Sequence, residues 1–505
     1  MPRIRLHPQG SELPAGTGQR LGDLLFAHGV EQPCGGRGTC RGCRVQVLEG
    51  QLEAGEADRR AFTPSELHAG WRLGCQARVE GDLTLALGRW NAPILADDTP
   101  VTVTPRDGLG IAIDLGSTTL VAQLVDRRDG RVLGVRTALN PQAMRGADIM
   151  TRIDHAQRGG ADELRLMVWT ELGRLIAALL AAAGGGAPSL VTVAGNTVMH
   201  HLFIGRDLAP LATPPYDPAD PGEVVLDGET LGWAGCAGCP VVVLPCLGGF
   251  VGGDILAGLL ATGLGHDRRP GALIDLGTNG EIAISDGTRI LCASTAAGPA
   301  FEGASISCGM RAATGAISAV TLDRGVLVAQ VIGGGPARGV CGSGLVDACV
   351  AARRLGWLAG TGRILRSDRR LPLAPGVDLT QDDIRQLQLA KGAVAAGFWL
   401  LLRRMNLAPE DLGRVWLAGA FGNAIDRASA HAVGLLPIPP ERVTPAGNTA
   451  LLGARLALGD DDHGYRALRA RCQHVQLKTD EGFEDVYLDG MAFPELVATP
   501  PAKEA

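Results

Sequence analysis

The fold is decided by one short block that occurs twice, as Asp114-Leu115-Gly116-Ser117-Thr118-Thr119 and as Asp275-Leu276-Gly277-Thr278-Asn279-Gly280. Each copy follows an apolar run and precedes a second strand-like run, so each predicts a hairpin with a turn rich in Gly, Ser and Thr. The copies lie a domain length apart, which is much longer than a solenoid repeat. We therefore expect two related half-domains that face a shared cleft.

Length and composition restrict the class of protein. The 505 residues, of which 46% are hydrophobic, are enough for several domains with large buried cores. The net charge of −6 gives no basic field that would attract nucleic acid or an anionic membrane. No Lys follows a Gly-rich phosphate loop, which excludes a P-loop ATPase.

The sequence also predicts where the protein works. Residues 1–5 lack the apolar core of a signal peptide. The longest uncharged stretch, residues 230–253, is broken by Pro240 and Pro245 and predicts no membrane-spanning helix. We expect a cytoplasmic protein, in which the twelve Cys are ligands or structural thiols rather than disulfides.

Three regions can be separated along the chain. Residues 1–90 are Gly-rich and contain four Cys, residues 91–107 have the composition of a linker, and residues 108–499 alternate strand-like with helix-like runs. The alternation predicts an α/β architecture, which we expect to divide into its two halves near residues 266–271.

Helices and one alternative strand are also predicted. Residues 382–404 have helical spacing after a Thr380 cap, and residues 164–183 form a second helix that ends at three glycines. Alternation at residues 101–104 leaves open a short strand inside the linker.

Four cysteines in the first region have the spacing of a metal centre. Cys34, Cys40 and Cys43 lie in one Gly-rich loop, and Cys75 stands alone after 31 intervening residues. Glycines allow a loop to wrap an inorganic core and to aim N–H groups at its sulfides, which favours a 2Fe-2S cluster. Zinc usually draws on two knuckles, but a zinc site and unliganded thiols remain alternatives.

This region resembles the plant-type ferredoxins over about 85 residues. The resemblance implies a β-grasp fold and a cluster held by the four cysteines. Five residues, instead of four, separate Cys34 from Cys40, which argues against a photosynthetic-type partner.

The two Asp-containing hairpins have the chemistry of a nucleotide site. Their N–H and hydroxyl groups can donate to phosphate oxygens, and Asp114 and Asp275 can hold Mg²⁺ near those phosphates. A Gly-lined segment after a late strand can form a platform for adenosine. The candidate nucleotide-binding residues are Gly116, Ser117, Thr118, Thr119, Gly277, Thr278, Asn279, Gly280, Gly419, Ala420, Phe421, Gly422 and Asn423.

These segments resemble the phosphate-1, phosphate-2 and adenosine segments of the acetate and sugar kinase/Hsp70/actin (ASKHA) superfamily. By their chemistry, Asp114 and Asp275 are candidate catalytic residues with Mg²⁺-ATP, and Glu302 could orient the attacking water. Gly342 and Ser343 are further nucleotide candidates, and Ser343 is as weak a candidate as Asn196 and Asp254. Gly-rich turns of an ordinary α/β enzyme are the alternative.

Further blocks match a narrower group, the reductive activators of corrinoid proteins, of which the chain is identified as a member. The blocks are 194–197, 252–254, 296–303, 341–345 and 389–393. The resemblance implies ATP-dependent reduction of a cobalamin-type Co(II) corrinoid to Co(I) for methyl transfer. It also implies a corrinoid partner from a methyltransferase system, a cellular low-potential electron donor and a homodimer. The extra middle domain of the longest members is expected to be absent.

Three other functions fit parts of the pattern. They are an activator of another low-potential enzyme such as a radical dehydratase, a small-molecule kinase regulated by a ferredoxin, and a non-catalytic electron carrier.

Some residues stay outside this function. Cys236, Cys239 and Cys246 are either buried structural thiols or a second metal site, and the pattern favours thiols. His200-His201 favours packing over ligation. Lys391 fits a solvated helix face and a nucleotide contact equally well.

Overall fold

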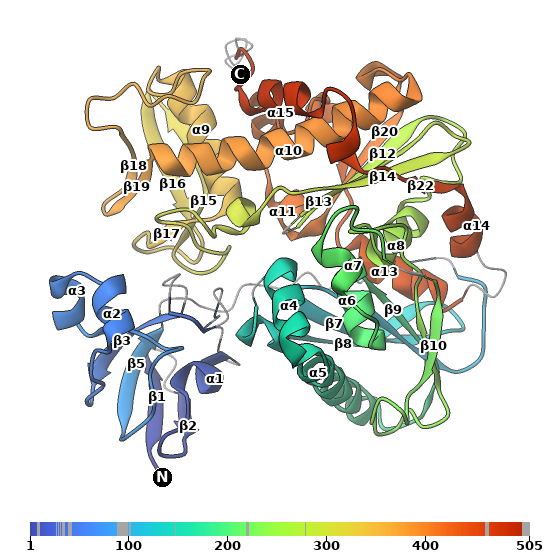
Figure 1. The fold of residues 1–505 in the computed structure, drawn as a ribbon, viewed down its shortest axis with the longest axis horizontal. Helices are drawn as coiled ribbons and strands as arrows, with labels where there is room; N and C mark the ends of the chain where they lie inside the picture. Colours follow the sequence, from blue (N-terminus) through green and yellow to red (C-terminus); the bar gives the residue numbers. More distant parts are fainter. Residues whose placement is uncertain are drawn as a thin grey trace. The chain divides into compact units, whose positions relative to one another are not determined.

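A computed structural model (Figure 1) describes the chain except for residues 8–10, 27, 29, 31, 33–35, 39–42, 88–98, 100, 102, 147, 219–221, 278, 460–463 and 497–505. Two compact units are present, residues 1–257 with 450–462 and residues 258–449 with 463–505. The chain passes between the units within α8 (Gly253–Thr262) and α13 (Thr449–Ala457). None of the described helices combines the length and apolarity needed to span a bilayer.

The N-terminal part of the first unit is a five-stranded mixed sheet with short helices. Strands run in the order β2-β1-β5-β3-β4, with β1 and β5 parallel. Ile4 and Leu6 alternate with exposed neighbours along β1, and their side chains belong to a separate apolar core formed within residues 4–87. The sheet confirms the β-grasp expectation. Its elements are β1 (Arg3–His7), β2 (Ser11–Pro14), α1 (Leu21–Phe26), β3 (Arg44–Glu49), α2 (Glu56–Ala61), α3 (Pro64–His68), β4 (Trp71–Leu73) and β5 (Leu83–Leu87).

The rest of the first unit is built on a six-stranded sheet, β10-β11-β9-β6-β7-β8. β6 and β7 form the predicted hairpin, and β9 is parallel to β6. The apolar face of α5 covers β7 and β8. The elements are β6 (Leu109–Leu115), β7 (Thr119–Asp126), β8 (Arg131–Leu139), η1 (Pro141–Met144), α4 (Ile149–His155), η2 (Ala156–Gly160), α5 (Ala161–Ala182), β9 (Pro188–Gly195), α6 (Thr197–Ile204), α7 (Ala209–Ala212), β10 (Val224–Asp227) and β11 (Pro240–Val243).

The second unit repeats this arrangement in the sheet β21-β20-β12-β13-β14-β22. Its hairpin β12/β13 continues into β14, and β20 is parallel to β12, as β9 is to β6. The duplicated α/β architecture expected from the two sequence blocks is therefore confirmed. The sheet strands are β12 (Gly271–Leu276), β13 (Gly280–Ser285), β14 (Ile290–Thr295), β20 (Arg414–Ala418), β21 (Val443–Pro445) and β22 (Cys472–His474).

Helices and two small sheets complete the second unit around one large apolar core. The remaining elements are η3 (Pro299–Glu302), β15 (Ala316–Asp323), β16 (Val326–Val331), β17 (Gly339–Val340), α9 (Gly342–Arg354), β18 (Arg370–Ala374), β19 (Val377–Thr380), α10 (Gln381–Met405), η4 (Pro409–Asp411), α11 (Gly419–Ala424), α12 (Arg427–Ala432), η5 (Pro440–Arg442), α14 (Gly464–Arg471), η6 (Leu477–Thr479) and α15 (Phe483–Met491).

Both predicted helices are confirmed. The Thr380 hydroxyl accepts a hydrogen bond from the Asp383 N–H, and the Asp383 carboxylate accepts one from the Thr380 N–H. This capping box starts α10 one residue before the predicted boundary. The helix α5 ends at Ala182, ahead of the three glycines. The alternative strand at residues 101–104 is absent at the described positions 101, 103 and 104.

The structure corrects the prediction that Lys391 lies on a solvated helix face. Its side chain is fully buried on α10, and its ammonium donates to Gly490 O at 2.6 Å and to Ala492 O at 2.7 Å. These carbonyls end α15, which lies alongside α10 (Figure 1). Burial lowers the pKa of Lys391 to about 7. The lysine therefore anchors a helix C-terminus, and a solvated helix face was the wrong expectation.

Candidate functional site

Strand pairing brings two of the four predicted cluster ligands together. Cys43 directly precedes β3, Cys75 follows β4, and the antiparallel register pairs Arg44 with Leu73. The Cys75 N–H donates to Cys43 Sγ at 3.4 Å, and both cysteines are buried. Cys34 and Cys40 lie outside the described residues.

The glycines of the same loop fit a wrapped inorganic core. Gly36 and Gly38 have φ values of 78° and 76°, in the left-handed region that side chains disfavour. Gln76 Nε2 donates to Gly36 O at 2.5 Å, and a Cβ on Gly38 would lie 3.0 Å from the Gln76 side chain. The described thiols and the glycine backbone therefore suit a 2Fe-2S cluster, which would be completed by Cys34 and Cys40.

The first hairpin holds its turn by backbone contacts. A Cβ on Gly116 would collide with Thr119 O, so the turn between β6 and β7 needs a glycine there. Asn140 Nδ2 donates to Gly116 O at 2.8 Å, and the Asn140 N–H donates to Thr118 O at 2.8 Å. Ser117 completes this turn, which Asp114 precedes at the end of β6.

A buried arginine beneath this turn was missed in the sequence. Arg152 on α4 is fully buried and donates to Ser117 O, to Gly146 O at 2.9 Å and to Gln142 Oε1 at 3.0 Å. Nothing in the sequence near Arg152 identifies these acceptors, because the fold brings them together from separate segments.

Asp254 lies in the electrostatic field of Asp114. Burial and, to a lesser extent, the charge of Asp114 raise the pKa of Asp254 to about 7. A Cβ on Gly252 would collide with the Asn196 backbone, so the loop before α8 packs tightly on the N-terminus of α6. The Asn196 carboxamide accepts from the Met199 N–H at 3.0 Å and caps α6. The fold thus brings Asp114, Asn196 and Asp254 into one region of the first unit.

The second hairpin meets the platform segment through Gly419. This glycine has φ of 84°, and a Cβ on it would lie 2.5 Å from Asp275 Oδ1 and 2.5 Å from Leu276 O. The Gly277 N–H donates to Asn279 O at 3.0 Å. A Cβ on Gly280 would lie 2.8 Å from Thr295 Oγ1. Thr278 lies outside the described residues.

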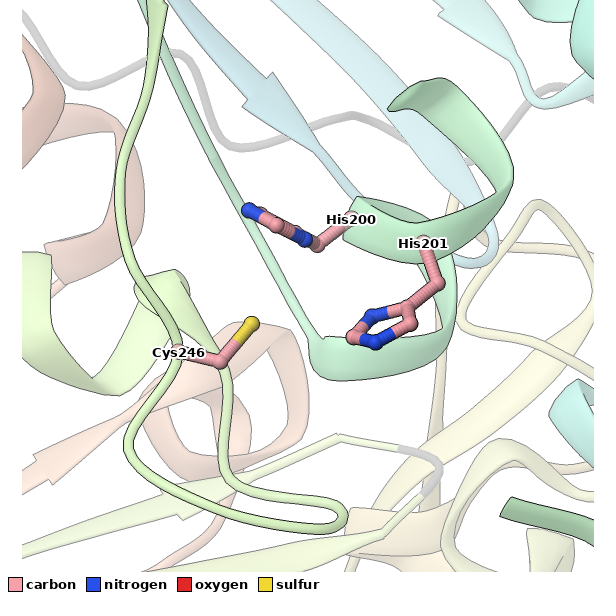
Figure 2. Close-up of side chains that lie close together, drawn as sticks. All are labelled: His200, His201 and Cys246. Atoms are coloured by element: carbon pink, nitrogen blue, oxygen red, sulfur yellow. The ribbon is translucent and has the colours of Figure 1, made fainter. Parts of the chain in front are cut away.

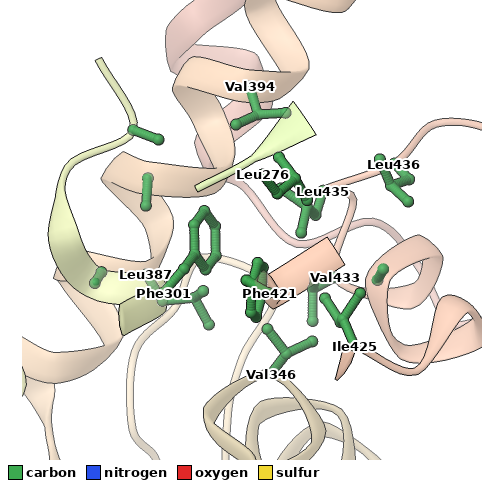
Figure 3. Packing of buried hydrophobic residues seen from close by; sticks show 14 of the residues in the cluster. Leu276, Phe301, Val346, Leu387, Val394, Phe421, Ile425, Val433, Leu435 and Leu436 are labelled. Carbon is green, nitrogen blue, oxygen red and sulfur yellow. The ribbon is translucent and has the colours of Figure 1, made fainter. Parts of the chain in front are cut away.

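Phe421 supports the platform from inside the core. Its ring stacks on Phe301 with centroids 4.5 Å apart and planes 15° apart, among aliphatic residues such as Leu276 (Figure 3). The ring of Phe421 is therefore engaged in packing, and the backbone from Gly419 to Asn423 is what the segment offers to a ligand. Asn423 Oδ1 accepts from the Gly447 N–H at 3.1 Å. Ala420 and Gly422 lie on the same short helix, α11.

Glu302 and the start of α9 are neighbours. A Cβ on Gly342 would collide with Phe301 O, so the N-terminus of α9 approaches η3 closely. The Ser343 hydroxyl donates to Ser318 O at 2.7 Å. Glu302 Oε2 lies 3.8 Å from Arg311 Nη2.

The CxxC cysteines have the burial that is typical of structural thiols. Cys236 and Cys239 are buried, and burial raises their pKa values to about 12 and about 11. Such thiols stay protonated at neutral pH and are poor nucleophiles.

Three family models cover most of the chain. The 2Fe-2S iron-sulfur cluster binding domain matches residues 4–80, the RACo middle region matches residues 109–267, and the C-terminal domain of RACo, the ASKHA domain, matches residues 270–502. The middle-region match overturns the expectation that a middle domain is absent.

The chain is also similar to individual proteins that reduce or activate corrinoid proteins by name. The corrinoid activation enzyme RamQ of Eubacterium limosum is 34% identical over 437 residues, which are 80% of this chain and 73% of the relative. The Co(II) methylated amine-specific corrinoid protein reductase of Methanosarcina barkeri is 27% identical over 76% of this chain and 77% of that protein. A solved structure of a reductive activator for corrinoid,iron-sulfur protein is 26% identical, with a TM-score of 0.67 and 98% coverage of each chain.

Proposed function

The chain belongs to the family of corrinoid-protein reductive activators, and from this premise we propose that it reduces a Co(II) corrinoid protein to Co(I) in an ATP-dependent reaction. One observation carries the proposal: a single chain combines a ferredoxin-type domain with two Asp-containing hairpins in matching sheets. One electron passes from a cellular low-potential donor to cobalt, and methyl transfer requires the resulting Co(I).

The cysteines supply the redox half of the activity. Cys43 and Cys75, together with Cys34 and Cys40, would hold the 2Fe-2S cluster, which when bound supplies a one-electron carrier. The Cys75 N–H, aimed at Cys43 Sγ, stabilises negative charge on that sulfur and so favours the thiolate form.

The hairpins supply the ATPase half. We assign Asp114 and Asp275 to Mg²⁺, held directly or through water, and the hairpin turns to the phosphates. Glu302 orients the attacking water, and the Gly419–Asn423 backbone carries the adenosine. Because desolvation and the nearby Asp114 raise the pKa of Asp254 to about 7, this carboxyl group can accept or donate a proton close to neutral pH.

ATP contributes through the affinity for the partner. If nucleotide changes the affinity for the Co(II) state relative to the Co(I) state by about 1–3 kcal/mol, the effective potential shifts by roughly 40–130 mV. The partner is a corrinoid protein of a methyltransferase system. A cytoplasmic location and a homodimer complete the proposal.

The test uses the cluster-loaded chain with a chemical reductant, Mg²⁺-ATP and candidate Co(II) corrinoid proteins, with Co(I) measured by its visible spectrum. Asp275→Ala should lose at least about tenfold of the ATP stimulation. The matched control is Asp267→Ala, because the partly exposed Asp267 carboxylate accepts hydrogen bonds from nearby Arg269. The proposal fails if no corrinoid protein is returned to Co(I), and an unchanged Asp275→Ala variant would indicate a passive electron carrier.

A further inference from the structure

Two histidines and a cysteine that are separate in the sequence meet inside the first unit. His200 and His201 lie on α6, and Cys246 lies in the loop between β11 and α8. One ligand atom from each lies within 4.8 Å of the other two, and the thiol points toward the histidines (Figure 2). All three side chains are at most 1% exposed. Imidazole and thiolate are ligands for soft and borderline metal ions.

The tautomer of His201 leaves a lone pair available. Its Nδ1 lies 2.8 Å from Thr197 O, and because a carbonyl only accepts, Nδ1 carries the proton. The Nε2 atom of His201 has no hydrogen-bond partner among the described residues. Burial lowers the pKa of His201, which favours the neutral ring. A backbone carbonyl on one ring nitrogen is the usual way in which a metal-ligating histidine is oriented.

We propose that His200, His201 and Cys246 bind one d10 metal ion, Zn²⁺ or Cu⁺. On binding, the thiol releases its proton to solvent and a sulfur–metal bond forms without change of oxidation state. With Cu⁺ the thiolate leaves no net charge in the buried site, whereas Zn²⁺ leaves one positive charge. Ligand atoms around zinc are about 3.5 Å apart, so the three side chains need to close by only about 1 Å.

The metal would join two segments that lead to the nucleotide residues. Cys246 and Gly252 lie in the same loop, which leads to Asp254 in the first turn of α8, and α6 begins directly after Asn196. The loop already contacts α6, because the Thr197 hydroxyl donates to Gly248 O at 2.8 Å. A bound ion adds a second link between loop and helix, which should raise the melting temperature of the unit.

The test measures binding to the anaerobic, cluster-loaded full chain. Zn²⁺ and Cu⁺ are added in separate arms, excess metal is removed, and bound metal and iron are counted by mass spectrometry. Co²⁺ in a third arm should give a thiolate-to-metal charge-transfer band. Cys246→Ser and His201→Gln should each weaken binding at least tenfold, whereas the buried control Cys239→Ser should bind like the parent.

The proposal is supported if the parent chain binds one equivalent of Zn²⁺ or Cu⁺ while its iron content stays constant. The Co²⁺ charge-transfer band and the rise in Tm should then be lost in Cys246→Ser or His201→Gln. It is overturned if the parent chain binds neither ion. It is equally overturned if both folded variants bind as tightly as Cys239→Ser. These readouts do not depend on corrinoid reduction, so failure of this site is distinguishable from failure of the proposed function.

Discussion

Replacing Arg152 by methionine should loosen the first phosphate hairpin without removing any residue of the turn itself. The guanidinium of Arg152 is fully buried and donates to Ser117 O, Gly146 O and Gln142 Oε1. Methionine has a similar length but no N–H group. The substitution therefore leaves these acceptors without this donor while keeping much of the side-chain volume.

The expected cost follows from those acceptors. Gln142 Oε1 keeps a second donor in Asn140 Nδ2 at 3.4 Å, so two acceptors, Ser117 O and Gly146 O, lose their donor. A buried acceptor that loses its donor costs about 1–3 kcal/mol, so these two cost about 3 kcal/mol together. This is a factor of more than about 100 in the local opening equilibrium. The comparison is Arg131→Met, since Arg131 is exposed and its 3.6 Å pair with Asp129 should contribute less than about 1 kcal/mol.

Hydrogen exchange measured by mass spectrometry checks the prediction. Peptides that contain residues 115–121 should exchange roughly 100-fold faster in Arg152→Met than in Arg131→Met, and the affinity for ATP should fall in parallel. Arg152→Lys, which keeps the charge but loses the planar fork of donors, should lie between them. If exchange and ATP affinity are the same in Arg152→Met and Arg131→Met, the arginine does not hold the turn and the reasoning is wrong.

Two further predictions concern the second unit. Gly419→Ala places a Cβ 2.5 Å from Asp275 Oδ1 at a φ of 84°, so ATP affinity measured by calorimetry should fall at least about tenfold. Gly413→Ala, whose nearest neighbour would be 3.5 Å away, should change nothing, and equal affinities would contradict the assignment. For Lys391, burial lowers the pKa from 10.5 to about 7, so between these values the unfolded chain binds more protons and stability rises with pH. In urea unfolding at several pH values, the free energy of unfolding should rise less steeply with pH in Lys391→Met than in the parent chain, by up to about 1.4 kcal/mol per pH unit. Equal slopes in the two proteins would refute a buried lysine with a lowered pKa.

The sequence by itself determined the features that depend on neighbouring residues. Each hairpin was predictable because an apolar run, a Gly/Ser/Thr turn and a second apolar run are contiguous. The start of α10 was predictable because the Thr380 cap and Asp383 are one turn apart. The repeated block and the cysteine spacing likewise indicated the duplicated architecture and the ferredoxin domain.

Only the tertiary structure decided which distant groups meet. The sequence did not identify Arg152 as a support of the hairpin, because its acceptor Ser117 O lies on another segment. Lys391 was expected on a solvated or nucleotide-binding face for the same reason, since its acceptor Gly490 O lies on another helix. Cys246 was considered with its CxxC neighbours, but the loop before α8 carries it to the histidines of α6. Buried polar groups must find partners wherever the packing of the apolar core places them, and that packing is a property of the whole fold rather than of adjacent residues.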